Sequence, residues 1–278
     1  MILPQRRIIE GFPFSIIQFE EIDSTNRFLK DYGRRSPENG LIAMAGAQTA
    51  GRGRFGNTWH SPKGQGLYFS MLLHPVDPRS AMAVPLIAGV VLHKTLEEMF
   101  PAVKRSLDLK WPNDVLIERR KVAGVLVELE HLPAGTSLVV VGIGVNCNQN
   151  EFPAQLPGAT SLRLHVGARV DPVSLLDAFL IRWHDYAGAS DLNMGPESKS
   201  ADAPMPSPAI AFSLSKAVAD WKDRSTFWKD RAVRFNLNGE TLEGATCDVA
   251  PSGALLVRLK SGRLKELLSG EVEWIRNI

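Results

Sequence analysis

Lys110–Ile117 (KWPNDVLI) is followed by the charged tetrapeptide Glu118–Lys121 (ERRK) and by the apolar run Val122–Glu128 (VAGVLVE). Two apolar runs separated by a few polar residues are typical of a β-hairpin with a polar tip. Further along, Val139–Asn146 (VVVGIGVN) is an apolar run that contains two glycines and ends on an amide. It predicts a buried strand. The centre of this chain is therefore expected to be a sheet.

The segments around this hairpin alternate strands with helices. Serine, aspartate and proline are common where helices begin, so either Asp23 or Ser24 is expected to be one N-cap and Asp171 another. Helices are predicted at Thr25–Tyr32, Met82–Met99 (begun or kinked at Pro85), Pro172–Tyr186 and Ala209–Trp228. Strands are predicted at Ser15–Ile22, Leu41–Gln48, Leu67–Leu73, Leu107–Trp111, Val115–Ile117, Val122–Glu130 and Leu138–Asn146.

The C-terminal part differs in pattern from the rest. From Arg231 onward, short apolar runs are separated by Asn238-Gly239, Ser252-Gly253 and Ser261-Gly262, which are turn signals. They predict a small all-β barrel of about fifty residues, judged from the turn spacing. Ahead of it, Gly195–Pro208 contains four prolines and no large aliphatic or aromatic residue. That composition predicts a loop or a disordered insertion.

Composition narrows the class of protein. The chain has 278 residues, of which 44% are hydrophobic and 22% charged, as in an ordinary soluble globular protein. A net charge of +2 gives no case for strong attraction to nucleic acid or membranes. Cys147 and Cys247 lack the spacing of a metal site, and two free thiols suit a reducing compartment. Ala81–Val91, the longest apolar stretch, is too short to span a bilayer. No signal peptide is evident, and a cytoplasmic protein is expected.

Gly51–Trp59 (GRGRFGNTW) is the clearest sign of a ligand. Glycine allows close approach of the backbone to a ligand, and arginine offers a fork of donors to carboxylate or phosphate oxygens. The run therefore predicts a cationic loop that closes over an anion. It lacks the Gly-Lys-Ser/Thr ending of a phosphate-binding P-loop, and no long helix follows it. A solvated basic turn and an RNA-binding Arg-Gly tract are the alternatives.

Together these motifs resemble the biotin protein ligases, the biotin–[acetyl-CoA-carboxylase] ligases. The resemblance extends from about Phe14 to Leu192 and resumes near Arg231. The matching segments are Ser24–Asn26, Gln48–Arg54, Lys110–Asp114, Lys121–Gly124 and Gly142–Asn146.

The resemblance implies an α+β fold in two domains. The first, expected at residues 1–228 with the insertion at 195–208, would be a mixed sheet packed with helices, like a class II synthetase or a biotin–lipoate ligase catalytic domain. The second, expected at 229–278, would be a small SH3-like β-barrel. Longer family members carry an N-terminal winged-helix domain. The fourteen residues ahead of Ser15 are too few for one, so no specific DNA binding is expected.

The resemblance also implies a two-step reaction. The biotin carboxylate attacks the α-phosphorus of ATP, with Mg²⁺, giving biotinyl-5′-AMP and pyrophosphate. A lysine of an acceptor then attacks the adenylate. The implied acceptor is the biotin carboxyl carrier protein of acetyl-CoA carboxylase, with other biotin-dependent carboxylases as further candidates. Neither step needs a protein nucleophile, but the protein must bring the two anions of the first step together and neutralise charge in the transition state. The implied state is a monomer or a weak homodimer, and no membrane partner is expected.

The residues implied to bind biotin fall into three groups: Ser24, Thr25 and Asn26 at the ureido ring, Gln48 at the ureido or carboxylate end, and Gly51, Arg52, Gly53, Arg54, Lys121 and Gly124 around the carboxylate. Ser24–Asn26 could equally be a plain helix cap, and capping is compatible with biotin binding.

Lys121 and Arg54 are implied to be the catalytic residues, with Lys121 between the biotin carboxylate and the α-phosphate. Arg119 and Arg120 beside it leave open a merely solvated hairpin tip. Phe55 stands where many family members carry a basic or polar residue. This difference is expected to alter how the loop closes.

A partly overlapping set is implied to bind the nucleotide. Trp59 would pack on adenine or form a wall of the site, and a buried core position is the alternative. Asn146 would bind adenine or ribose, and Asp114 would also bind Mg²⁺ through phosphate. The full set is Arg54, Trp59, Lys110, Asn113, Asp114, Asn146 and Arg276.

Two other functions remain open. A lipoate–protein ligase or a lipoyl/octanoyl transferase has the same catalytic fold. A transferase needs a nucleophilic cysteine near the loop, and a lipoate ligase is expected to lack the glycine-arginine run. A non-enzymatic nucleic-acid-binding module would need clustered basic charge with exposed aromatic residues.

Overall fold

A computed structural model describes residues 5–36, 38–77, 81–132, 137–187, 213–237, 239–268 and 272–275. The predicted insertion at 195–208 and Arg276 lie outside these residues.

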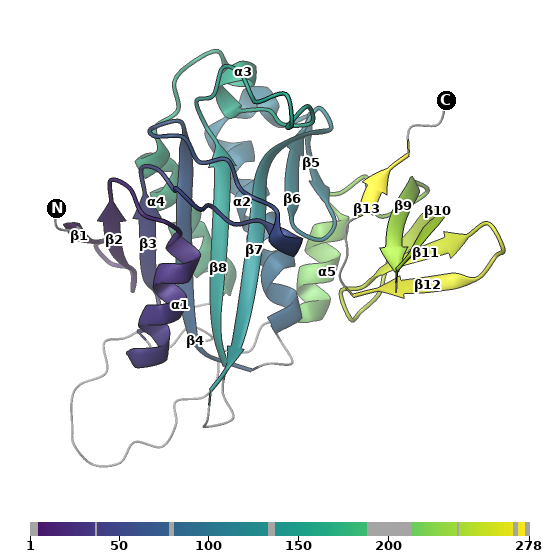
Figure 1. Cartoon of the computed structure of the whole chain (residues 1–278), viewed down its shortest axis with the longest axis horizontal. Coiled ribbons are helices and arrows are strands. Elements are labelled where there is room, and N and C mark those ends of the chain that lie inside the picture. Colours follow the sequence, from purple (N-terminus) through teal and green to yellow (C-terminus); the bar gives the residue numbers. More distant parts are fainter. Residues whose placement is uncertain are drawn as a thin grey trace.

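The larger of two sheets forms the body of the molecule (Figure 1). Its eight strands lie in the order β1-β2-β3-β4-β8-β7-β6-β5, and only β2 and β3 run parallel to each other. The strands are β1 (Gln5–Ile8), β2 (Ser15–Phe19), β3 (Leu41–Ala45), β4 (Gly66–Val76), β5 (Leu107–Lys110), β6 (Asp114–Ile117), β7 (Arg120–His131) and β8 (Ser137–Asn146).

Helices cover both faces of this sheet. In Figure 1, α1 lies on the near face and α2 and α4 lie behind the sheet, with α5 beside α2. The helices are α1 (Thr25–Arg35), α2 (Val84–Met99), α3 (Leu162–Val166), α4 (Pro172–Ala187) and α5 (Leu214–Lys222). The sheet is therefore the middle layer of three.

Alternation along β8 explains how one strand serves both layers. Leu138 and Val140 pack in a small cluster with α1, whereas Val139 and Val141 belong to the main core on the opposite face. Side chains alternate across a strand, so the positions that follow on the α1 face are 142 and 144. Both are glycines. Near the N-terminal end of α1, this face of the sheet therefore leaves space above the two glycines.

The smaller sheet is formed by the C-terminal strands. Its order is β12-β11-β10-β9-β13, all antiparallel. Gly239, Gly253 and Gly262 have φ of 84°, 82° and 81°, a region that glycine enters without strain. The strands are β9 (Ala232–Leu237), β10 (Glu240–Val249), β11 (Leu255–Leu259), β12 (Leu264–Leu267) and β13 (Val272–Trp274).

Together the two sheets confirm the predicted α+β class, a mixed helix-covered sheet followed by a small β domain. A short strand and a short α-helix were not predicted. β1 precedes Ser15, where the first strand was expected, and pairs with β2 at the sheet edge. The five-residue helix α3 was also missed. Within the described residues, no helix is long and apolar enough to cross a membrane.

One predicted helix ends earlier than expected. Ala209–Trp228 was expected to be helical; residues 209–212 lie outside the described residues, α5 occupies Leu214–Lys222, and the residues after Lys222 do not continue the helix. The residues that follow bond to β5 instead of continuing the helix. Ser225 Oγ donates to Leu109 O at 2.6 Å, and Thr226 N donates to Asp108 Oδ1 at 2.8 Å. These long-range bonds replace the local helical ones.

The predicted hairpin tip is also shorter than expected. Glu118–Lys121 was predicted to be the turn, but only Glu118 and Arg119 form it, with φ of 51° and 63°. Two successive residues with positive φ are the geometry of a tight two-residue hairpin turn. Arg120 and Lys121 therefore belong to β7. Lys121 lies in the sheet and not on a solvated tip.

Candidate active site

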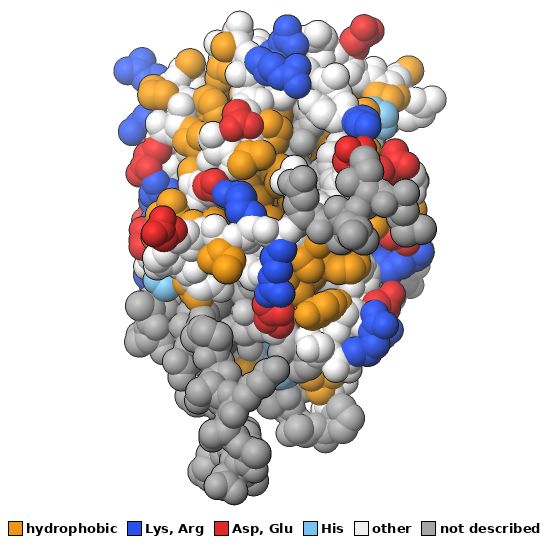
Figure 2. All heavy atoms as spheres, turned by 90° about the vertical axis from the view of Figure 1, so that its left-hand side faces the viewer, with side chains coloured by type: hydrophobic (Ala, Val, Ile, Leu, Met, Phe, Trp, Pro, Cys, Tyr) orange, Lys and Arg blue, Asp and Glu red, His pale blue; other side chains and the backbone are white. Residues whose placement is uncertain are grey.

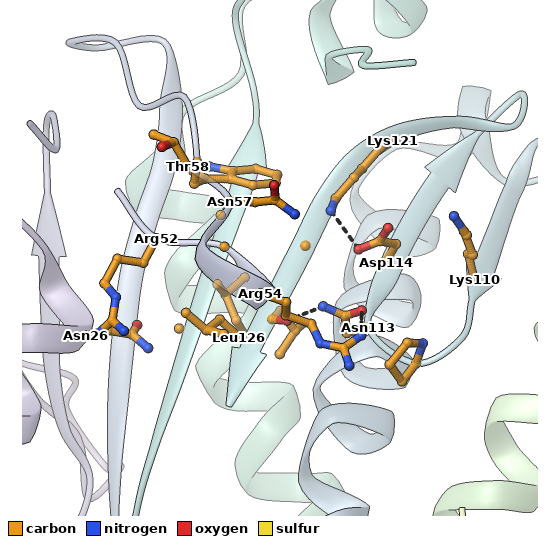
Figure 3. A pocket seen from close by; sticks show the side chains of 18 of the residues that line it. Asn26, Arg52, Arg54, Asn57, Thr58, Lys110, Asn113, Asp114, Lys121 and Leu126 are labelled. Atoms are coloured by element: carbon orange, nitrogen blue, oxygen red, sulfur yellow. Dashed lines mark hydrogen bonds and ion pairs between the residues drawn. The ribbon is translucent and has the colours of Figure 1, made fainter. Parts of the chain in front are cut away.

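A cavity of about 310 Å³ lies over the β7–β8 part of the sheet, on the same face as α1. Its lining comes from the start of α1, the loop 52–59, the β5–β6 turn, strands β7 and β8, and β13 of the small sheet. Figure 3 shows side chains from the loop and from the hairpin on opposite sides of it. Segments far apart in sequence therefore meet at one site.

Glycines form the floor of the cavity. A Cβ added at Gly142 would lie 1.9 Å from Asn26 Oδ1, and one at Gly144 would lie 2.3 Å from Trp59 Nε1. At Gly124 the nearest atoms would be Lys121 Cε at 3.0 Å and Nζ at 3.1 Å. Separations below 3.0 Å do not occur for real side chains, so Asn26 and Trp59 can lie flat on β8 only because glycine stands there.

Ser24 begins α1 at the edge of the cavity. Its φ and ψ are −158° and 128°, and its Oγ accepts from Arg27 N, as expected of an N-cap. The alternative cap, Asp23, instead forms an ion pair with Arg27 at 2.8 Å. Capping fixes the direction of the first helical turn. Thr25 and Asn26 belong to that turn, and both line the cavity.

The glycine-arginine run folds back on itself. Gly53 N donates to Asn57 O at 2.7 Å, and Trp59 N donates to Gly51 O at 3.0 Å. A Cβ at Gly51 would lie 2.4 Å from Trp59 O, so this fold requires glycine there. Phe55, at φ 55°, is 61% exposed. The loop is thus a small hairpin held largely by its own backbone.

The two arginines of the loop point in different directions (Figure 3). Arg52 forms an ion pair with Glu128 of β7 at 3.1 Å. Arg54 Nη1 donates to Asn113 Oδ1 at 3.2 Å. Side chains of the loop therefore reach both ends of the cavity.

Lys121 reaches the cavity because β7 contains a β-bulge. Leu116 pairs with Lys121 and Val115 pairs with Ala123, which leaves Val122 as the extra residue. Val122 and Ala123 both enter the main core, and a bulge has this effect of placing two successive side chains on one side. Lys121 and Gly124, three residues apart, consequently share the cavity face.

The position of Lys121 is fixed on several sides. Its Nζ lies 2.8 Å from Asp114 Oδ1, the ion pair drawn in Figure 3, and 5.2 Å from the centre of the Trp59 ring. Its backbone N donates to Gly158 O, and its backbone O accepts from Thr160 N. Both bonds lie on one edge of the strand, and Leu116 of β6 pairs with Lys121 on the other edge.

The tryptophan-proline-asparagine-aspartate turn joins the two sheets. Asn113 accepts from Arg54 and donates its Nδ2 to Val125 O. Trp111 is buried, and its Nε1 donates to Gly253 O of the small sheet at 2.9 Å. Val272 and Glu273 of β13 contribute to the cavity lining. The small sheet is thus part of the site.

Most of the residues predicted from the sequence line this cavity. They are Ser24, Thr25, Asn26, Gln48, Arg52, Gly53, Arg54, Trp59, Lys110, Asn113, Asp114, Lys121 and Gly124.

Two of the predicted residues do not line it, and a third lies outside the described residues. Gly51 is not a lining residue, but it allows the loop to fold back against Trp59. Asn146 is buried, donating to Thr160 O at 3.1 Å and accepting from Gln149 Nε2 at 3.2 Å, so its amide is engaged within the protein. Arg276 lies outside the described residues.

Other lining residues, and two residues that contact the lining, were missed. Glu128 could have been found from strand alternation, since it lies four residues after Gly124 on the same face of β7. Ser70 could have been noticed as a hydroxyl within the apolar strand β4. The lining residues that were not predicted are Asn57, Thr58, Phe69, Trp111, Pro112, Val125, Leu126, Gly142, Ile143, Gly144, Val272 and Glu273.

The arrangement suits the binding of anions. Arg52, Arg54, Lys110 and Lys121 line the cavity, against the carboxylates of Asp114 and Glu273. Among the described residues, no group of three or more histidine, cysteine, aspartate or glutamate side chains could hold a metal ion by itself. The chemistry that this arrangement supports is charge stabilisation by fixed cations.

Comparison with known proteins agrees with this geometry. Residues 18–146 match the biotin/lipoate A/B protein ligase family, and residues 230–274 match the biotin protein ligase C-terminal domain. The biotin–[acetyl-CoA-carboxylase] ligase of Mycobacterium tuberculosis is 31% identical over 242 residues, which cover 86% of this chain and 80% of that protein. This chain belongs to the biotin/lipoate A/B protein ligase family.

Two further relatives show how far the likeness extends. The bifunctional ligase/repressor BirA of Bacillus subtilis is 34% identical over 179 residues, 62% of this chain. The chain spans about half of that protein's length, 54%. The biotin protein ligase of Aquifex aeolicus, solved in complex with biotin and ATP, is 29% identical with a TM-score of 0.70. That match covers 94% of this chain and 99% of the other.

Proposed function

We propose that this protein attaches biotin to a lysine of a biotin carboxyl carrier protein, with biotinyl-5′-AMP as the intermediate and ATP as the second substrate. The observation that carries the proposal is the opposed placement of cations around one cavity. Arg52 and Arg54 approach from the loop, and Lys121 approaches from β7. Two anionic substrates that repel each other need such an arrangement before they can react.

Lys121 is proposed to act on the reacting groups. Its ammonium group pairs with Asp114, and its backbone is bonded on both edges of the strand. A preorganised charge needs no reorganisation as negative charge develops on the α-phosphoryl group. Lys121 can therefore neutralise both the biotin carboxylate and the phosphate oxygen that it approaches.

The biotin end of the cavity is proposed to be the α1 end. Ser24, Thr25, Asn26 and Gln48 lie there and supply neutral hydrogen-bonding groups. The nucleotide is proposed to lie toward Lys110 and Asn113, near β13. Trp59, lying between Gly144 and Lys121, would then pack against the ligands where the two substrates meet.

Mg²⁺ is proposed to enter with ATP. Asp114 offers one carboxylate on the nucleotide side, and its Oδ1 already pairs with Lys121. Mg²⁺ is commonly held by one or two carboxylates together with substrate phosphates and water. Asp114 fits as a single protein ligand, and the metal would supply charge neutralisation at the phosphates.

The organisation of the whole protein is proposed in the same terms. We place the boundary between the catalytic and the small β domain near residue 228, since β9 begins at Ala232. A cytoplasmic location is proposed because both cysteines are free.

The competing functions have less support. Cys147 is buried and burial raises the pKa of its thiol to about 12, so it is unsuited to be the nucleophile of an acyl transferase. Cys247 lies on β10, outside the cavity lining. On the face shown in Figure 2, acidic and basic side chains are interspersed, which does not favour a nucleic-acid-binding surface.

A direct assay tests the proposal. The protein is incubated with ATP, Mg²⁺, biotin and a purified biotin carboxyl carrier domain, and the carrier is analysed by intact mass spectrometry. One biotinyl group on one lysine, absent without ATP, is expected. Modification with lipoate but not with biotin would instead identify a lipoate–protein ligase.

A further inference from the structure

Glu128 is a carboxylate of β7 that contacts the cavity-lining residues Arg52 and Asn26, and its side chain is 15% exposed. It pairs with Arg52 at 3.1 Å and with Lys30 at 3.6 Å. Its Oε2 also lies 3.0 Å from Asn26 Nδ2. A carboxylate can only accept hydrogen bonds. The Asn26 side chain must therefore turn its NH₂ toward Glu128 and its oxygen away.

That oxygen fixes the next hydrogen bond. Asn26 Oδ1 lies 2.6 Å from Ser70 Oγ, and an amide oxygen only accepts. Ser70 must therefore donate its single proton to Asn26. Ser70 is fully buried on β4, so its bonds are confined to the protein.

The same argument reaches Thr25. Its Oγ1 lies 2.7 Å from Ser70 Oγ, whose proton is already used, so Thr25 donates there. Its other neighbour, Gln48 Oε1 at 3.2 Å, accepts from Thr25 N at 2.9 Å and is also an acceptor. While Ser70 donates to Asn26, the short contact between the two hydroxyl oxygens needs the Thr25 proton, and the contact with Gln48 at 3.2 Å is the longer and weaker alternative. Toward the cavity, this hydroxyl can only accept.

We propose that Glu128 is a positioning residue that acts through Asn26 and Ser70 to fix Thr25 as a hydrogen-bond acceptor for an N–H group of the ligand. The inference rests on the proposed function, in which the ligand is biotin. The ureido ring of biotin carries two N–H groups beside one carbonyl. Ser24 complements this pattern, because its Oγ accepts from Arg27 N and keeps its proton to donate to a carbonyl. The relay therefore selects a cyclic urea by the direction of its hydrogen bonds.

Changing Glu128 to glutamine should allow the hydrogen bonds of the relay to reverse their donor–acceptor direction. A glutamine can offer its own NH₂ to Asn26, which lets the Asn26 amide rotate, Ser70 donate to Thr25 and the Thr25 proton turn outward. Glu130 provides a matched control. It lies two residues further on the same strand and also pairs with Lys30, at 3.9 Å, but makes no contact with Asn26.

The experiment compares biotin with two cyclic carbamate analogues, in which one or the other ureido N–H is replaced by a ring oxygen. Dissociation constants are measured by titration calorimetry for the wild type and for Glu128→Gln, Ser70→Ala and Glu130→Gln. Thermal unfolding identifies any variant that does not fold. The wild type should bind biotin at least about tenfold more tightly than one carbamate, as expected for a buried acceptor that loses its donor.

In Glu128→Gln and Ser70→Ala, this ratio should fall to about threefold or less, and Glu130→Gln should keep it. A purely electrostatic or structural role of Glu128 would weaken all three ligands alike and leave the ratio unchanged. An unchanged ratio in both relay variants, a ratio equally lost in Glu130→Gln, or a wild type that binds biotin without discrimination overturns the relay. A wild type that does not bind biotin overturns the proposed function itself.

Discussion

The glycine-arginine loop and the β6–β7 hairpin both bring cations to the cavity, but they are held in different ways. The loop, Gly51–Trp59, is bonded mostly to itself, and its tip residue Phe55 is exposed. Lys121 of the hairpin belongs to a strand that is paired on both edges, and the adjacent Val122 and Ala123 are buried in the main core. Moving the loop breaks few contacts, whereas moving Lys121 disrupts the sheet.

This difference separates the roles of the cations. A charge that stabilises a transition state must be fixed in advance. A charge that admits substrates and then retains an intermediate must be able to move. Asn113 links the two regions, because it lies on the β5–β6 turn and accepts from Arg54 of the loop. We therefore expect chemistry to depend on Lys121 and retention of the adenylate to depend on Arg54.

The largest effect is expected from Lys121→Ala. Loss of one preorganised charge contact typically raises a barrier by roughly 3–4 kcal/mol, a fall in rate of about 10²–10³. Biotin-dependent pyrophosphate release measures it. The control is Arg119→Ala, which removes an exposed cation from the same hairpin. A rate for Lys121→Ala within about fivefold of wild type, roughly 1 kcal/mol, would contradict the role of Lys121.

Arg54→Gly should have a smaller effect, and of another kind. The variant removes charge-assisted hydrogen bonds to the intermediate, each worth roughly 1.5–3 kcal/mol. The adenylate should form but escape, and then acylate lysines of unrelated proteins. Biotin labelling of serum albumin measures the escape, with Lys121→Ala as the contrasting variant that makes little adenylate. If Arg54→Gly consumes ATP yet labels no more albumin than wild type, the retention role is wrong.

Gly144→Ala tests how the sheet supports the loop. The new methyl group would lie 2.3 Å from Trp59 Nε1, so the indole must move away from β8. Overpacking of this kind costs about 1–3 kcal/mol, and biotin binding should weaken with the displaced tryptophan. Gly158→Ala is the control, since nothing lies within 4 Å of a Cβ added there. Biotin affinity is measured by calorimetric titration and stability by thermal unfolding for both variants. Equal affinities and equal stabilities of the two variants would contradict the role of Gly144 in the floor of the cavity.

The smallest effect is expected in hydrogen exchange of the unmodified protein. Residues 50–57 should become protected when biotin and ATP are added, because the ligands supply anions that offset the entropy lost on closure. Backbone amides of β6 and β7 should change little. Equal protection of the loop with and without ligands would show that it is not a lid.

The sequence by itself determined much of the fold and which residues form much of the site. Apolar runs predicted β4, β7 and β8 to within a few residues, and Asn-Gly and Ser-Gly pairs located the turns of the small sheet. These signals are local, since they depend on short runs of apolar residues and on the freedom of glycine to adopt positive φ. The cap of α1 was narrowed to Asp23 or Ser24 by another local signal, the preference of such residues for helix starts, and Ser24 is the cap.

Tertiary structure alone decided how the site is assembled. The bulge at Val122 turns Lys121 toward the cavity, and it depends on pairing with β6. Asn146 is diverted from the cavity by a bond to Thr160, and Trp111 is committed to Gly253 of the small sheet. Ser70 and Glu128 acquire their roles only through Asn26, which is far from both in sequence. Each of these depends on long-range contacts that no local pattern encodes, and the free energy of such contacts outweighs local preference.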